Sequence, residues 1–431
     1  VRMILPNSYI ILSIKFKIIT LLKLILLVIK LPALNGIKVK LFLSLALSLF
    51  FTVTSCERSI HDIHMESFVA DTHNDIILRA MEGEDILSFH QETQSDLEKF
   101  KLGGVDLQVF SIWVSPSNVN NDEEYFQKAN SMISKLNFLI SRVPDDWGLV
   151  KSFQDISYNN RKNKMSCVIG VEGGHIIGNK IERIDQLHNR GMKYLGLTWN
   201  NSNNIASSAK DEVLNINSLS VIGLSNFGKK VIRRCNDLGV IIDVSHLGEQ
   251  AFWDVIEQSK SPIIASHSSV FSLCPHYRNL KDDQIKAIAK KGGAVFINFY
   301  PGYIDSTFSK KADLVDSKYD IELEILAEKY DTLSNQYWFE KMKLLKHEKA
   351  KFAPNINDVI KHISYVVDLV GVDFVGIGSD YDGVEIMPTG LENVAKLPFL
   401  TKKLIENGYT IRDVRKILGG NFKRIFKEVC K

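Results

Sequence analysis

Short, solidly apolar segments alternate along most of the chain with longer segments whose apolar residues recur at helical spacing. Eight of the short segments are predicted strands, and several of them are solid runs of Val, Ile and Leu, which is typical of strands buried on both faces of a parallel sheet. These predicted strands are 68–73, 105–114, 167–172, 193–199, 240–246, 262–267, 294–299 and 374–380. The predicted helices include 124–142, 224–238, 249–258, 282–290 and 357–369. Eight strands with intervening helices over about 360 residues predict a TIM-type (β/α)8 barrel.

One segment departs from this alternation. Residues 305–352, between the last two predicted strands, are rich in Lys, Glu and Asp and keep an apolar period. We expect a solvated helical insertion before the last strand. The predicted organisation is a targeting segment at 1–55, a leader at 56–67 and the barrel at 68–431.

Two apolar segments precede the predicted barrel. The first, 9–29, is interrupted by three lysines, and residues 1–36 are either translated upstream sequence or a first membrane segment. The second, 41–51, follows Lys38 and Lys40 and is shorter than the roughly 20 residues that span a bilayer. Its basic start, apolar middle and polar end of small residues are typical of a signal peptide.

The end of this second segment reads Val53-Thr54-Ser55-Cys56. It is similar to the lipobox of bacterial lipoproteins, in which the cysteine is lipidated and the preceding segment is removed. We therefore expect Cys56 to anchor an extracytoplasmic protein to a bacterial membrane. The alternative is a signal-anchor helix with an incidental cysteine.

Charged residues are distributed differently before and after residue 55. The net charge is +3, but residues 1–55 hold seven Lys and Arg and no Asp or Glu. Beyond them, 50 acidic residues face 46 basic ones. The part predicted to fold is mildly acidic, so the basic surface expected of a nucleic-acid-binding protein is missing.

Polar residues follow the carboxyl ends of five predicted strands. In a TIM-type barrel the active site lies at this end. The residues are Asp71-Thr72-His73-Asn74-Asp75, Glu172-Gly173-Gly174-His175, Ser245-His246, Ser266-His267 and Ser379-Asp380-Tyr381-Asp382.

Five of these residues are competent to bind metal. His73 and Asp75 alternate along one strand and so project to the same side. A bridging carboxylate such as Glu172, completed by His246 and His267, would hold a second ion. Imidazole and carboxylate suit zinc or a similar divalent metal. Each histidine taken alone is as readily a core or loop residue, but five such residues at one end of successive strands indicate a two-metal site.

The last strand ends in a carboxylate that the metals do not need. Asp380 is therefore predicted to take and deliver the proton of an attacking water. Asp382 is the competing candidate, and in the alternative interpretation both are turn residues around Gly383.

These segments together resemble the membrane (renal-type) dipeptidases, zinc metallopeptidases of the amidohydrolase-like barrel group. The resemblance runs from Phe68 to Val429. Besides the strand-end segments it rests on Ala265-Ser266-His267-Ser268-Ser269, Arg278-Asn279, Asn298-Phe299-Tyr300 and Gly376-Ile377-Gly378-Ser379-Asp380-Tyr381-Asp382-Gly383.

The resemblance implies a site with two Zn²⁺ ions. It places one zinc on His73, Asp75 and Glu172, and the other on Glu172, His246 and His267. Glu172 would be the bridge and a catalytic residue, and Asp380 matches the family's proton-transfer acid.

The resemblance also assigns substrate contacts. Arg278 matches the residue that receives the substrate's C-terminal carboxylate, which a guanidinium grips through two hydrogen bonds; the alternative is a surface salt bridge. Trp199 stands where the animal enzymes carry a substrate-contacting histidine, and Tyr300 is the third predicted substrate residue. An indole donates one hydrogen bond and carries no charge, so Asn200 or Asn203 is a candidate replacement donor.

The sequence thus predicts a lipid-anchored zinc dipeptidase acting on dipeptides with a free C-terminal carboxylate, with a D-residue tolerated at that end. Homodimerisation is implied by the family alone. Two alternatives stay open: lactam or N-acyl amide hydrolysis at the same metal pair, and a non-catalytic surface lipoprotein that binds peptides.

Overall fold

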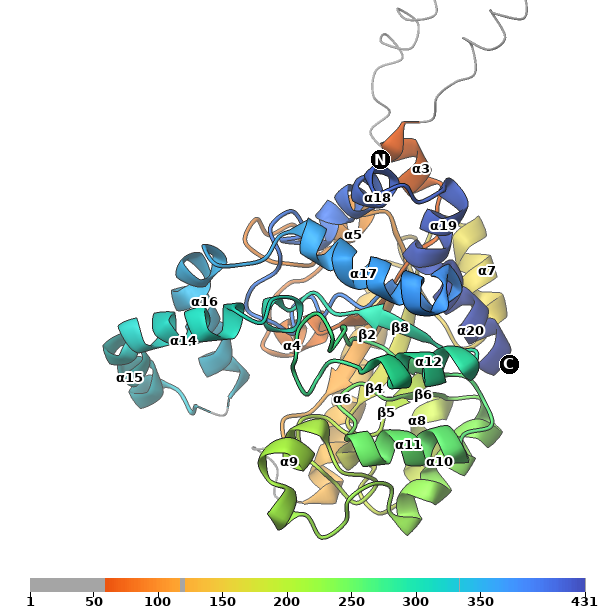
Figure 1. Cartoon of the computed structure of the whole chain (residues 1–431), viewed down its shortest axis with the longest axis vertical. Helices are drawn as coiled ribbons and strands as arrows, with labels where there is room; N and C mark the ends of the chain where they lie inside the picture. The colour runs from red at the N-terminus through yellow and green to blue at the C-terminus, as the bar shows by residue number, and fades with distance from the viewer. Residues whose placement is uncertain (1–58, 117–120, 333, 431) are drawn as a thin grey trace, which may run out of the picture. The chain divides into compact units, whose positions relative to one another are not determined.

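The computed structural model describes residues 59–116, 121–332 and 334–430, and its compact unit begins at Ile60 (Figure 1). The predicted signal segment at 1–55 and the lipidation site Cys56 lie outside the described residues. None of the described helices combines the length and apolar character needed to cross a bilayer.

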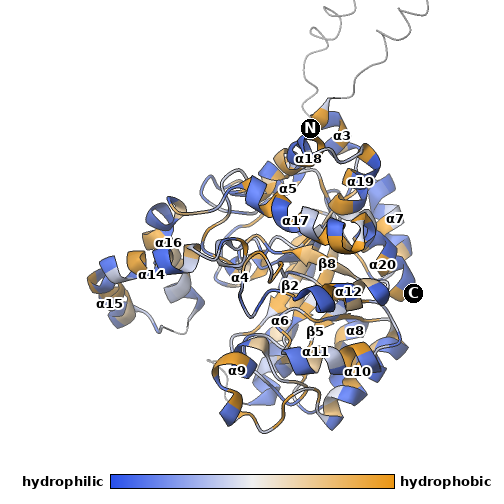
Figure 2. Cartoon of the chain, in the orientation of Figure 1, coloured by the Kyte–Doolittle hydropathy of each residue, from blue (hydrophilic) through white to orange (hydrophobic). Residues whose placement is uncertain are grey.

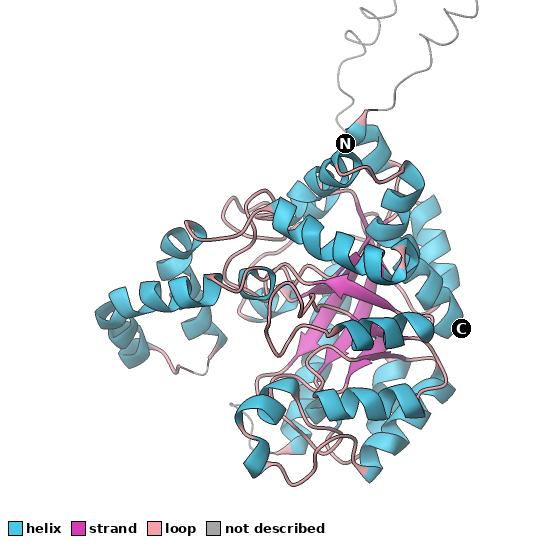
Figure 3. Cartoon of the chain, in the orientation of Figure 1, coloured by secondary structure: helices cyan, strands magenta, loops and turns pink. Residues whose placement is uncertain are grey.

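Eight parallel strands form a closed barrel at the centre of this unit (Figure 3). They are β1 (Val69–Asn74), β2 (Val105–Trp113), β4 (Met165–Glu172), β5 (Met192–Gly196), β6 (Ile241–Asp243), β7 (Ile263–Ala265), β8 (Ala294–Ile297) and β9 (Val375–Ile377). The hydrogen-bonded circuit runs β1-β2-β4-β5-β6-β7-β8-β9 and returns to β1. The TIM-type barrel and its eight predicted strands are confirmed.

A short ninth strand, β3 (Trp147–Leu149), pairs with the first residues of β4 outside this circuit. The hydrophobic pattern did not predict it, because three residues including Gly148 are too short to show a strand period.

Helices surround the barrel and connect its strands. They are α3 (Ile60–Met65), α4 (Ile76–Met81), α5 (Leu97–Leu102), α6 (Asp122–Arg142), α7 (Phe153–Arg161), α8 (Glu182–Asn189), α9 (Ala209–Leu214), α10 (Asn226–Leu238), α11 (Glu249–Gln258), α12 (Asp282–Lys290), α13 (Pro301–Ile304), α14 (Phe308–Lys318), α15 (Asp320–Lys329), α16 (Asn335–Ala350), α17 (Ile356–Val370), α18 (Leu397–Glu406), α19 (Ile411–Arg415) and α20 (Asn421–Val429). The five predicted helices are all present. Local chemistry sets their ends: in α10 the Ser225 side chain accepts from the Gly228 N–H, and the helix stops at Gly239 with a left-handed φ of 69°.

The strands are buried on both faces, as their continuous apolar runs predict. All eight residues of β4 are buried. Inside the barrel, Tyr194 and Phe296 belong to a cluster that Phe422 and Phe426 of α20 complete. In Figure 2 the hydrophobic colour accordingly gathers along the central strands, while the helices are mixed.

Helix α3 falls within the predicted leader but packs with the barrel helices. His64 is fully buried, and its two ring nitrogens lie 2.7 Å from Thr401 Oγ1 and 2.8 Å from the Gly103 carbonyl. The compact unit therefore starts ahead of the predicted barrel boundary at Phe68.

The helical insertion between β8 and β9 contains α14, α15 and α16, which extend away from the strands (Figure 1). No residue of α15 is buried, whereas α16 buries Leu345 and Lys349. We call residues 305–352 the excursion.

Candidate active site

The predicted ligands gather at the carboxyl ends of the strands. The structure brings together all five of them and Asp380, each at most 8% exposed: His73, Asp75, Glu172, His246, His267 and Asp380. Ligand atoms of His73, Glu172 and His267 lie within 4.8 Å of one another, as do those of His73, Asp75 and Asp380.

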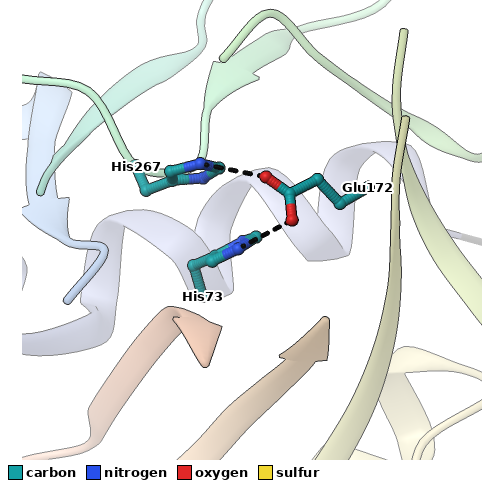
Figure 4. A group of neighbouring side chains, drawn as sticks. All are labelled: His73, Glu172 and His267. Atoms are coloured by element: carbon teal, nitrogen blue, oxygen red, sulfur yellow. Dashed lines mark ion pairs between the residues drawn. The ribbon is translucent and has the colours of Figure 1, made fainter. Parts of the chain in front are cut away.

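Glu172, the last residue of β4, stands between two sets of side chains. Its Oε2 lies 3.5 Å from His73 Nε2, which is in turn 3.5 Å from Asp75 Oδ2. Its Oε1 lies 3.0 Å from His246 Nε2 and 3.4 Å from His267 Nε2. Figure 4 shows one carboxylate oxygen turned to His73 and the other to His267. A carboxylate that bridges two metal ions needs its two oxygens to face two different sets of ligands, as those of Glu172 do.

Hydrogen bonds to the Nδ1 atoms of His246 and His267 determine which nitrogen of each ring carries the proton. His246 Nδ1 lies 2.9 Å from the side-chain oxygen of Asn200, which only accepts. His267 Nδ1 lies 2.7 Å from Ser266 Oγ, and that hydroxyl donates its hydrogen to Asp243 Oδ2 at 2.6 Å. Both imidazoles therefore hold their proton on Nδ1, and Nε2 keeps a free lone pair.

His73 is held in the same way from inside the barrel. Its Nδ1 lies 2.8 Å from the Tyr194 hydroxyl, which donates to the Thr72 carbonyl at 3.2 Å. His73 Nε2 is buried and has no hydrogen-bond partner among the residues that the structure describes. It faces Glu172 and Asp75, which together with Tyr194 raise the pKa of this ring despite its burial.

This arrangement fits a metal centre. The Nε2 atoms of His246 and His267 are 3.0 Å apart with no proton available to lie between them. Burial lowers the pKa of His246 to about 3, so its ring is neutral. Unprotonated nitrogens that converge on a buried carboxylate need a cation between them, and imidazole with carboxylate suits zinc or a similar divalent ion.

Asp380 follows β9 in a left-handed backbone conformation, with a φ of 66°, and His246 after β6 has the same φ. Such conformations cost free energy for non-glycine residues and concentrate at functional sites. Burial, reinforced by Asp75 and Glu172, raises the pKa of Asp380 to about 7. Its Oδ2 accepts a hydrogen bond from Asn298 Nδ2 at 2.9 Å. A carboxyl held this way can exchange a proton near neutral pH.

Asp382, the competing candidate, has a structural partner. Its Oδ1 lies 3.0 Å from Arg79 Nη1, and its backbone N–H donates to the Gln94 side chain at 2.7 Å. Gly383 beside it is required for space, because a Cβ there would collide with the carboxylates of Asp75 and Asp380.

A cavity of about 290 Å³ opens above these residues. Arg278 lines it and is only 2% exposed. Its guanidinium donates to the His267 carbonyl at 3.2 Å and to Ser268 Oγ at 3.4 Å, while Nε has no partner in the described part of the chain. Among the described residues, no carboxylate forms a salt bridge with it, so the surface salt-bridge alternative fails.

Trp199 also lines the cavity, with its ring centroid 4.9 Å from that of Trp113. Asn200 lines it as well, and its side-chain oxygen accepts from His246 Nδ1. Asn203, by contrast, bonds the Leu197 carbonyl and the Ile205 N–H, which stabilises its own loop.

Tyr300 is not among the residues that line this cavity. Its ring packs against those of Phe308 and Tyr303, with centroids 6.1 and 4.8 Å away. Pro301 begins α13 directly after it, and this turn brings Tyr303 to the cavity instead. A substrate contact for Tyr300 stays a prediction.

Sequence reasoning named Ser266 and Asn200 but missed their role of orienting His267 and His246. Both neighbour predicted site residues, so their positions were a usable signal. Tyr194 reads as an apolar strand residue, and Trp338 of the excursion, which lines the cavity, has no local signal at all.

Comparison with known proteins decides the family. The sequence model of the membrane dipeptidase family (peptidase family M19) matches residues 57–431. The chain belongs to this family. It is a metallo-dipeptidase, a metal-dependent hydrolase of peptide bonds.

Individual proteins that the chain resembles are also described as dipeptidases or metallopeptidases. Dipeptidase aclJ of Aspergillus oryzae is 28% identical over 342 residues, which cover 78% of this dipeptidase and 70% of that protein. The probable dipeptidase PvdM from Pseudomonas aeruginosa has the same fold, with a TM-score of 0.71 at 24% identity, over 86% of this chain and 97% of that one. A Rhodobacter sphaeroides metallopeptidase, liganded with a phosphinate mimic of L-Ala-D-Ala, gives a TM-score of 0.68 at 21% identity over 84% and 100% of the two chains.

Proposed function

We propose that this dipeptidase binds two zinc ions. One is held by His73, Asp75 and Glu172, and the other by Glu172, His246 and His267. The supporting observation is that the two carboxylate oxygens of Glu172 face different histidines. A metal pair bound there supplies Lewis acidity and lowers the pKa of water towards neutrality.

The substrate we propose is a dipeptide with a free C-terminal carboxylate. Arg278 supports this assignment, because it is a buried guanidinium in the same cavity with an unpartnered Nε. A guanidinium binds a carboxylate through two parallel hydrogen bonds. The mimic bound by the Rhodobacter sphaeroides relative ends in D-Ala, which supports tolerance of a D-residue at that end.

The proton is moved by Asp380 in this proposal. Asp380 takes a proton from the attacking water and returns it to the leaving amine, which needs a carboxyl that titrates near neutrality. Asn298 fixes one carboxylate oxygen and leaves the other free to reach the substrate. Trp199 and Trp113 exclude water from one wall of the cavity.

For the location we propose an extracytoplasmic lipoprotein, anchored through Cys56, that acts on dipeptides released from the cell envelope. The lipobox-like sequence supports this proposal. A homodimer stays a prediction from the family. Mass spectrometry of the N-terminal peptide from cells tests the anchor, since an unmodified Cys56 would contradict it.

Hydrolysis of L,L- and L,D-dipeptides by the purified, zinc-loaded chain tests the activity. We expect cleavage that a chelator abolishes, about two zinc ions per chain, and loss of turnover in Glu172→Ala. Glu182→Ala, on an exposed position of α8, is the control and should behave as wild type.

Two outcomes would contradict this function. Bound zinc without cleavage of any dipeptide would favour lactam or N-acyl amide hydrolysis at the same centre. Absence of both zinc and turnover would favour a peptide-binding lipoprotein.

A further inference from the structure

The excursion reaches into the active-site cavity. The cavity that contains Glu172, Asp380 and Arg278 is also lined by Asn335 and Trp338, from the first turn of α16. Trp338 is half-buried, so its indole covers part of the cavity while remaining accessible. The excursion is therefore part of the substrate site as well as a solvated insertion.

Helix α16 is fixed to the barrel by a buried ion pair. Lys349 is 4% exposed, and its Nζ lies 2.7 Å from both Glu385 Oε2 and Asp316 Oδ1. Glu385 belongs to the loop that follows β9, and Asp316 to α14. Because a buried lysine is stable only when paired, these contacts hold α16 in one position on the barrel.

Further contacts, one at the start of α16 and one near its end, place this helix beside the connection from β1 to β2. Asn335 Nδ2 donates to Glu82 Oε1 at 3.3 Å, directly after α4. Lys346 Nζ donates to the Glu92 carbonyl at 2.9 Å. Leu78 of α4 lines the cavity on this same side.

This side lies across the barrel mouth from Arg278. In the circuit of eight strands, β2 and β7 are four positions apart and so face each other. Arg278 follows β7, whereas Trp113 is the last residue of β2. A dipeptide with its carboxylate at Arg278 and its peptide bond at Glu172 therefore extends its amino-terminal residue towards Trp113.

Large hydrophobic side chains form part of the lining of this cavity. They are Leu78, Trp113, Trp199, Trp338 and Val384, while Thr332, Ser334 and Asn335 of the excursion add polar groups to it. Such a surface stabilises a large apolar side chain more than a glycine, because contact removes apolar area from water.

We propose that Trp338 is a specificity-determining residue, through which the excursion selects dipeptides with a large apolar amino-terminal residue. This inference rests on the proposed function. Trp338 contacts the substrate side chain and takes no part in the proton transfer.

Steady-state kinetics of the zinc-loaded full chain on Gly-Ala, Leu-Ala and Phe-Ala test the proposal. Wild type should prefer Leu-Ala and Phe-Ala to Gly-Ala, and Trp338→Ala should reduce that preference about tenfold, mainly through KM. The zinc content of Trp338→Ala should stay near that of wild type. Ile325→Ala, a substitution at a side chain of α15 that is 59% exposed, is the matched control within the excursion.

The outcomes separate the inference from the proposed function. If wild type cleaves all three dipeptides and Trp338→Ala leaves their ratios unchanged, the specificity role is wrong while the dipeptidase stands. If wild type cleaves none, the proposed function itself fails. Should Trp338→Ala not fold, Trp338→Leu replaces it: a selective loss on Phe-Ala supports the proposal, and unchanged ratios overturn it.

Discussion

Ser266 Oγ accepts a hydrogen bond from His267 Nδ1 at 2.7 Å while donating its own hydrogen to Asp243. The Asp243 carboxylate also accepts from the Ser266 and Ser245 backbone N–H groups, at 2.8 and 3.0 Å. A buried carboxylate thus fixes a hydroxyl, and the hydroxyl fixes the tautomer of an imidazole. The lone pair that faces Glu172 is a consequence of this chain of bonds.

Removal of that hydroxyl should weaken metal binding. In Ser266→Ala the His267 ring loses its acceptor, so we expect zinc affinity to fall about 10- to 100-fold. Competition with a chromophoric chelator measures this affinity directly. Ser259→Ala is a matched control, because Ser259 is 3% exposed and bonds the Ser261 carbonyl away from the site. Equal zinc affinities in the two variants would contradict the positioning role.

The barrel and the cluster of ligands could be predicted because both are encoded locally. Several strands are continuous apolar runs, and in a parallel barrel the residues at the carboxyl end of a strand lie at the active-site mouth whatever their partners are. His73 and His267 could therefore be placed together without knowledge of any contact between them.

What could not be predicted depends on contacts between distant segments. The pairing of Lys349 with Glu385 and Asp316 holds the helix that carries Trp338, and no feature within residues 335–350 marks this helix as part of the site. Tyr303 replaces Tyr300 at the cavity because a helix begins at Pro301. The sequence favoured Asp380 over Asp382, but the ion pair between Asp382 and Arg79 joins segments 303 residues apart and has no local signal.

Arg278 should determine whether the enzyme recognises a free carboxylate. Arg278→Lys keeps the charge but loses the two-pronged geometry, so we expect kcat/KM on free dipeptides to fall about 10- to 100-fold. Wild type should reject C-terminally amidated dipeptides, and the variant should discriminate less. Arg234→Lys, at a half-exposed arginine paired with Asp185, is the control. Unchanged discrimination between acid and amide would remove Arg278 from carboxylate binding.

The two carboxylates after β9 should behave differently when neutralised. Asp380→Asn should lower kcat by about 10²- to 10⁴-fold without loss of zinc, because proton transfer is removed. Asp382→Asn should instead lower the free energy of unfolding by about 1–3 kcal/mol, because buried Arg79 loses a charged partner. Parallel kinetics, metal analysis and urea unfolding of both variants separate these effects. Full activity in Asp380→Asn would contradict its role.

His362 should make the stability of the protein depend on pH. It is 1% exposed, its Nδ1 accepts from the Val270 N–H, and its Nε2 lies 3.1 Å from the Ile304 carbonyl. Burial lowers the pKa of His362 to about 4, below the ordinary value of 6.5 that applies in the unfolded chain. The unfolded chain therefore binds the extra proton first, and stability is lost as pH falls from about 6.5 towards 4, by about 2 kcal/mol at pH 5.

Urea unfolding at pH 7 and pH 5 measures this loss, with a chelator present so that metal release does not contribute. His362→Gln should be less stable than wild type at pH 7 but should lose about 2 kcal/mol less between the two pH values. His347→Gln, which replaces an exposed histidine of α16, should keep the wild-type pH dependence. If all three proteins lose the same free energy between pH 7 and pH 5, protonation of His362 does not contribute to acid destabilisation.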